Sequence, residues 1–250
     1  MVSRGRRTVG ATMDLRRFYQ VSAVVLVAQV VVGLAGVLQV PQGTEVPIHW
    51  GPDGQPNGFA SPIVAFYVMP LITLGIVGLF AAIPHIEPRR AHLEASAGSF
   101  QTLAIGVVLF FGALQLVIVA AGVGRLQLDI NTLVGVGTGA LFIVIGRAMR
   151  NVRSNFMFGV RTPWTLTSEL SWRKTHEVVS WLFAALGAAL MAISVVAPEW
   201  LVWVVIAGVV VLLVVAFGYS YLVWRDDPNR TTGLANDAPE SQRAKPPDTP

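Results

Sequence analysis

The chain contains no cysteine among its 250 residues, and only 13% of its residues are charged. Without cysteine it can form no disulfide, no thiolate metal site and no thiol nucleophile. The scarcity of charge, together with 54% hydrophobic residues, excludes a globular domain of ordinary soluble composition. We therefore expect an integral membrane protein.

Charge is completely absent from six long apolar segments. Each has about the length, roughly 17–25 residues, that a helix needs to cross the bilayer, and none shows the polar alternation of a membrane β-strand. The segments are 18–39, 63–83, 100–123, 130–146, 178–197 and 200–224. We predict an all-α, polytopic membrane protein with six transmembrane helices, the first of which is retained rather than cleaved as a signal peptide.

The positive charges are distributed very unevenly between the connections. If the six segments alternate in direction, seventeen of the 18 lysines and arginines fall on one side and only Arg125 falls on the other. The positive-inside rule then places both termini in the cytoplasm. The formal net charge of +4 is explained by this asymmetry, so we expect no direct contact with nucleic acid.

The spans and connections divide the chain into segments. We predict a basic cytoplasmic N-terminus at 1–17, a two-span unit at 18–99 with a structured outer loop at 40–62, a four-span unit at 100–224 with an inner loop at 147–177, and a disordered cytoplasmic tail at 225–250. The tail is proline-rich and has no apolar periodicity. The two three-span halves share no repeat, which argues against an inverted-repeat transporter.

Two features inside the spans predict helix packing. Gly135 and Gly139 form a GxxxG face that favours close approach of a neighbouring helix, and no strand precedes them as a nucleotide-binding loop would require. Gln29 and Gln115 are isolated glutamines in the interior of apolar segments, and we expect each to bond across to another helix.

The outer loop contains the sequence VPIHWGPDGQPNGF, which is rich in glycine and proline turns and predicts a compact loop. Its candidate residues are Pro47, His49, Trp50, Asp53 and Gly54. A metal site built from His49 and nearby oxygens is conceivable, but one histidine without ligand spacing favours a structural role. We expect neither a metal nor any other cofactor.

The inner loop, from Arg147 to His176, combines six cations with four large aromatic residues in the sequence RAMRNVRSNFMFGVRTPWTLTSELSWRKTH. Gly159 and Pro163 predict a fixed bend. Thr167 is a predicted N-cap for a helix that continues into the fifth span and places Trp172 and His176 on one face.

Two interpretations of this loop stay open. It can anchor the protein, with arginines on lipid phosphates and aromatic rings at the interface; the arginines concerned are Arg147, Arg150, Arg153 and Arg161. Alternatively it is a docking site for a protein or peptide, because arginine and tryptophan are favoured at recognition sites. A membrane enzyme would have to use Glu169, His176 or Glu177, but the loop has no P-loop and no carboxylate cluster, and we expect no catalytic residue.

The segment NFMFGVRTPWTLTSELSWRKTH closely resembles the signature of the SdpI-type immunity proteins, bacterial membrane proteins that protect against a secreted sporulation-delaying toxin. The outer-loop sequence resembles an uncharacterised membrane domain that commonly precedes this signature. The signature falls on Asn155, Phe158, Gly159, Arg161, Thr162, Pro163, Trp164, Thr165, Leu166, Trp172, Thr175 and His176. Ser154 stands where the family pattern has proline, and we expect this change to loosen the approach to Asn155.

The resemblance implies an immunity protein of the bacterial cytoplasmic membrane that binds a peptide toxin and, in some members, holds a transcriptional repressor at the membrane. The partner-binding residues it suggests in the inner loop are Asn155, Phe158, Gly159, Arg161, Thr162, Pro163, Trp164, Trp172, Arg173 and His176. Membrane lipids are the remaining expected partners. The alternative is a small-solute or ion transporter, which six spans allow, although the spans lack the ionisable residues of a proton or ion relay.

Overall fold

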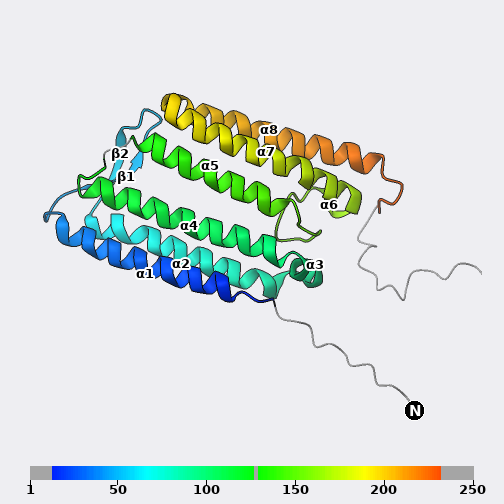
Figure 1. The fold of residues 1–250 in the computed structure, drawn as a ribbon, viewed down its shortest axis with the longest axis horizontal. Helices are drawn as coiled ribbons and strands as arrows, with labels where there is room; N and C mark the ends of the chain where they lie inside the picture. Colours follow the sequence, from blue (N-terminus) through cyan, green and yellow to red (C-terminus); the bar gives the residue numbers. More distant parts are fainter. Residues whose placement is uncertain (1–12, 127–128, 232–250) are drawn as a thin grey trace, which may run out of the picture.

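The computed structural model describes residues 13–126 and 129–231, and its main feature is a bundle of six long helices lying side by side (Figure 1). These helices are α1 (Arg16–Gln39), α2 (Pro62–Ile86), α4 (Ala97–Gly122), α5 (Ile130–Met149), α7 (Glu169–Val196) and α8 (Leu201–Arg225). All six are long and apolar enough to cross a membrane. The predicted all-α, six-span fold is therefore confirmed. The predictions for residues 1–12 and 232–250 lie outside the described residues.

The six helices form two groups of three. Helices α1, α2 and α4 all contact one another, whereas α7 packs against both α5 and α8. Contact between α4 and α5 joins the two groups, as Figure 1 shows. Helix α4 packs against α5 as well as against α1 and α2. These contacts do not test the predicted boundary between a two-span unit ending at residue 99 and a four-span unit beginning at residue 100.

Helices α5 and α7 approach each other at glycine. A Cβ on Gly139 would lie 2.5 Å from the carbonyl oxygen of Gly187, and a Cβ on Gly135 would collide with the side chain of Ser194. About two turns after Gly139, a Cβ on Gly146 would lie 2.5 Å from the carbonyl oxygen of Ser180. The GxxxG prediction is thus confirmed, since only glycine leaves room for backbone contact at these positions.

Gln29 and Gln115 each bond across to a neighbouring helix, as predicted. The side-chain amide of Gln29 on α1 donates to the carbonyl of Phe111 on α4 at 3.1 Å. That of Gln115 on α4 donates to the carbonyl of Phe66 on α2 at 2.8 Å. These bonds connect the three helices of the first group in an environment without water.

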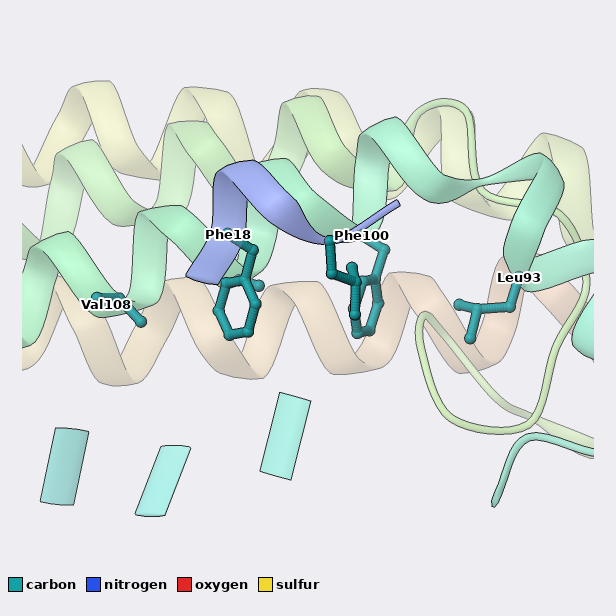
Figure 2. Packing of buried hydrophobic residues seen from close by; sticks show 6 residues of the cluster. Phe18, Leu93, Phe100 and Val108 are labelled. Atoms are coloured by element: carbon teal, nitrogen blue, oxygen red, sulfur yellow. The ribbon is translucent and has the colours of Figure 1, made fainter. Parts of the chain in front are cut away.

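A cluster of buried side chains fixes one end of the first group. Phe18 of α1, Phe100 and Val108 of α4, and Leu93 of the short helix α3 (Arg90–Ala95) belong to it (Figure 2). The ring of Phe100 also meets the ring of Phe158 from the inner loop edge to face, with centroids 6.3 Å apart. The core of the first helix group therefore continues into the inner loop of the second.

The bundle has two different ends. One end, here called the hairpin end, carries strands β1 (Val46–Trp50) and β2 (Pro56–Ala60); the other, the loop end, carries α3 and the short helix α6 (Pro163–Leu166) (Figure 1). A 3-10 turn at Pro198–Trp200 connects α7 to α8. The described chain begins and ends at the loop end, as six crossings require.

Candidate functional site

Polar side chains of the inner loop bond to the backbone of the same loop, and Asn155 makes three such bonds. The carboxamide oxygen of Asn155 accepts hydrogen bonds from the backbone amides of Met157 at 3.0 Å and Phe158 at 2.7 Å. Its nitrogen donates to the carbonyl of Arg153 at 2.8 Å. Asn155 is completely buried, so its side chain serves the backbone of the loop and is hidden from solvent.

Trp172 and His176 do share a face of α7, as predicted, and they stack with ring centroids 4.1 Å apart. The indole N–H of Trp172 donates to the carbonyl of Val152 at 2.7 Å. His176 Nε2 accepts from the amide of Val160 at 2.9 Å, while Nδ1 lies 2.8 Å from the carbonyl of Trp172. This pattern assigns the proton of a neutral imidazole to Nδ1. The two rings therefore attach the loop backbone to α7 at Val152 and at Val160.

Gly159 crosses directly over this stacked pair. Its φ of +118° lies in the region that favours glycine, and a Cβ there would lie 3.2 Å from the ring of Trp172 and closer still to His176. Both the turn and the close approach require glycine at this position.

Helix α6 begins with a capping box. The hydroxyl of Thr162 accepts from the amide of Thr165 at 3.1 Å, and the Thr165 hydroxyl accepts from the amide of Thr162 at 2.9 Å. The Thr162 hydroxyl also bonds to Ser220 of α8 at 3.1 Å. Pro163 at the first helical position is favoured because its missing N–H would have had no helical partner.

The N-cap of α7 is Ser168 and not Thr167, which corrects the sequence prediction. The Ser168 hydroxyl accepts from the amide of Ser171 at 2.9 Å. Thr167 instead donates to the carbonyl of Pro163 at 2.7 Å and closes α6. Two consecutive hydroxyl residues are equally plausible caps in sequence, and the intervening short helix decides between them.

The connection from α2 to α4 clamps the loop from the other helix group. The carboxylate of Glu87 accepts from the amide of Phe156 at 3.1 and 3.2 Å. The hydroxyl of Ser96 accepts from the amide of Arg153 at 2.8 Å. Neither Glu87 nor Ser96 is among the residues predicted from the sequence. Glu87 is buried, and its only signal in the sequence is its position directly after a span on the same side as the loop.

Ser154 is also clamped rather than loose. Arg89 donates to its hydroxyl at 2.6 Å, and His92 Nδ1 lies 2.7 Å from its carbonyl oxygen. Ser154 is 2% exposed. The expected loosening at this position is therefore absent, because the hydroxyl that replaces the family's proline gains a partner from the α2–α4 connection.

The predicted inner-loop residues separate into a buried and an accessible set. The buried set is Asn155, Phe158, Thr162, Trp172 and His176. The accessible set is Gly159, Arg161, Pro163, Trp164 and Arg173, of which Gly159 and Trp164 are partly covered. Trp164 packs edge to face on Phe217 and Tyr221 of α8, with centroids 6.2 and 5.3 Å apart. Only the accessible set can meet a partner without opening the loop; binding by any of them stays a prediction.

An open cavity of about 1200 Å³ lies at the loop end, between α3, the start of the inner loop and the first turns of α7. Its lining includes Trp172 and His176 of the stacked pair. Guanidinium groups are the main chemical feature of this cavity.

The predicted outer-loop residues lie on a two-stranded antiparallel hairpin, which the turn sequences alone did not predict. Val46 pairs with Ala60, and Trp50 pairs with Pro56. His49 Nδ1 lies 2.5 Å from the side-chain oxygen of Asn57 on the opposite strand. The tip turns at Gly54, whose φ is +73°. No group of three or more potential metal ligands occurs within residues 13–126 and 129–231.

The hairpin is anchored to the bundle. Val46 is fully buried in a cluster with Ala65 and Phe66 of α2 and Val119 of α4. At the tip, the side chain of Asn131 at the start of α5 donates to the carbonyl of Pro52 at 3.1 Å. On the hairpin, His49 and Asp53 are exposed and Trp50 is partly covered. Because the hairpin is anchored at both its base and its tip, these three residues have fixed positions.

Six spans, a hairpin at one end and a clamped loop at the other define a multi-pass α-helical membrane protein. Residues 151–220 match the SdpI/YfhL protein family, and residues 24–74 match a domain of unknown function (DUF1648). The resemblance to the SdpI-type immunity proteins is thereby confirmed.

A curated relative is the immunity protein SdpI of Bacillus subtilis (strain 168). It is 24% identical over 179 residues, which is 71% of this chain and 82% of the relative. No solved structure matches the chain. The similarity therefore extends well beyond the loop signature and includes most of the bundle.

Proposed function

We propose that this chain is an immunity protein of the bacterial cytoplasmic membrane that protects its cell by binding a membrane-active peptide toxin. The similarity to an immunity protein over 82% of that relative's length is the observation that carries the proposal. The toxin-binding role is what the resemblance to the SdpI-type family implies, and the loop end is proposed to face the cytoplasm.

Binding rather than catalysis is supported by how the inner loop uses its reactive side chains. Thr162, Thr165 and His176 are all buried, and each bonds to backbone within the loop. Side chains that are buried and hydrogen-bonded in this way stabilise the shape of the loop. A rigid loop with accessible arginine and tryptophan suits recognition.

The two ends of the bundle are assigned different partners. The hairpin, which carries His49 and Trp50 on β1, is proposed to bind the toxin. The accessible turn at Arg161 and Trp164 is proposed to hold a cytoplasmic repressor, as in the signalling members of the family. Hydrogen bonding of Arg161 to the carbonyl of Phe156 supports this assignment, because it keeps the turn in one conformation.

Complementation in the organism of origin tests the proposal. Cells that lack the gene should lose membrane potential and viability in conditioned medium from their own stationary-phase culture, and the wild-type chain should restore both. Protection should persist when Arg161 and Trp164 are both replaced by alanine, because that pair is assigned to the cytoplasmic partner, whereas His49→Ala with Trp50→Ala should weaken protection.

Immunoblotting of membrane fractions supplies the control that every variant is inserted to the same level. Deleted cells that resist the conditioned medium as well as wild-type cells would contradict the immunity function. Equal protection by the His49/Trp50 variant would contradict only the assignment of the toxin to the hairpin.

A further inference from the structure

The cavity at the loop end is strongly cationic. Five arginines and one acid, Glu169, are among the lining residues that the structure describes. The arginines are Arg89, Arg90, Arg150, Arg153 and Arg173. They come from the α2–α4 connection, the start of the inner loop and α7, so folding brings together charges that are far apart in sequence. Such a concentration of one sign attracts an anion.

The arginines differ in how far the protein already satisfies them. Arg89 donates to Ser154, and Arg90 pairs with Glu94 at 3.0 Å. In contrast, the guanidinium groups of Arg153 and Arg173 make no hydrogen bond or ion pair within the described part of the chain, and both side chains are exposed. Their planar N–H groups are available for the bidentate bonds that phosphate oxygens accept.

Arg150, whose guanidinium makes no hydrogen bond with another described residue, marks the lipid side of the cavity. The guanidinium of Arg150 lies over the ring of Trp181, 5.1 Å from its centroid. Trp181 is 60% exposed on the outer surface of α7, within a membrane span. Exposed tryptophans in spans favour the level of the headgroups, so this edge of the cavity opens where lipid phosphates lie.

We propose that this cavity binds the phosphate of an anionic phospholipid headgroup, with Arg153 and Arg173 as its ligands and Arg150 at the lipid side. The site is distinct from general attraction of the basic loop to the membrane. Arg147 and Lys174 belong to the same loop and carry the same charge, but they do not line the cavity. The proposal does not depend on the immunity function.

Native mass spectrometry of the full chain in detergent, with added phosphatidylglycerol, tests this site. The double variant Arg153→Gln with Arg173→Gln should bind phosphatidylglycerol at least about tenfold more weakly, because the charge-assisted bonds of both guanidinium groups to the phosphate are lost. The matched control, Arg147→Gln with Lys174→Gln, removes the same charge at two exposed positions and should bind as the wild type does. Zwitterionic phosphatidylcholine should bind weakly to all three.

Equal losses in the two double variants would overturn the proposal in favour of diffuse attraction. Displacement of the lipid by millimolar inorganic phosphate would show that the phosphate comes from solution and would overturn the lipid source. Circular dichroism and the unfolding midpoint confirm folding of each variant. The variant Arg153→Lys with Arg173→Lys keeps the charge without the planar fork; it should bind more weakly than the wild type, and unchanged binding would overturn bidentate recognition.

Discussion

Asn155 shows how much of the inner loop depends on one side chain. It satisfies two backbone amides and one carbonyl in a place that water does not reach. Burial makes each of these groups costly to leave without a partner. The residue that looks like part of a recognition motif is therefore first a requirement for the loop's shape.

Replacement of Asn155 by alanine should lower the free energy of unfolding by about 1–3 kcal/mol, because the amides of Met157 and Phe158 lose their acceptor. Denaturant unfolding in detergent, followed by tryptophan fluorescence, measures this change. Asn151→Ala is the control, since Asn151 is exposed nearby in the same segment. Equal midpoints for the two variants would show that Asn155 does not support the loop.

At the scale of elements, the contact between α5 and α7 depends on backbone approach. Gly139→Val should separate the two helices and cost several kcal/mol, about 3 or more, because the added atoms would meet the carbonyl of Gly187 at 2.5 Å or less. The measurement is the unfolding midpoint in detergent.

Gly137→Ala on the same helix is the matched control. A Cβ there meets only the ring of Phe110, at 3.6 Å, which is ordinary contact. This variant should be neutral or slightly more stable, by up to about 1 kcal/mol, because alanine favours helix over glycine. If Gly139→Val were tolerated as well as Gly137→Ala, close approach at glycine would not hold the second helix group together.

The sequence predicted those elements whose signal is local. Apolar length gave the six spans, and the spacing of Gly135 and Gly139 predicted a packing face. The hairpin was missed because Pro47, Pro56 and Gly58 weaken the strand pattern, and only pairing across the loop satisfies the backbone.

The candidate site was predictable only in part, for the same reason. Gly159 and Pro163 indicated a bend, which the structure contains. The clamp by Glu87 and Ser96 joins positions more than fifty residues apart, and no periodicity reports such pairs. Trp172 is buried because the loop folds back over α7. The charged residues Arg173 and Lys174 that follow it in the sequence give no indication of this burial.

At the scale of the whole molecule, the orientation in the membrane is the main prediction. The positive-inside rule places the loop end in the cytoplasm and the hairpin end outside. Because the native chain has no cysteine, single substitutions give unique labels: Arg161→Cys should react only with a membrane-permeant maleimide in intact cells, and Gln55→Cys should also react with an impermeant one.

Both labelled positions are exposed, so a buried thiol does not confuse the result. Labelling of each variant in detergent supplies the control for reactivity. Modification of Arg161→Cys by the impermeant reagent in intact cells would invert the orientation and, with it, the assignment of partners to the two ends.

The clamp on the inner loop joins the two groups of helices mechanically. Glu87 and Ser96 belong to the connection between α2 and α4, whereas their partners Phe156 and Arg153 follow α5. A force that spreads or tilts one group relative to the other must stretch these hydrogen bonds. The loop backbone at Arg153 and Phe156 is thereby coupled to the relative position of the two helix groups.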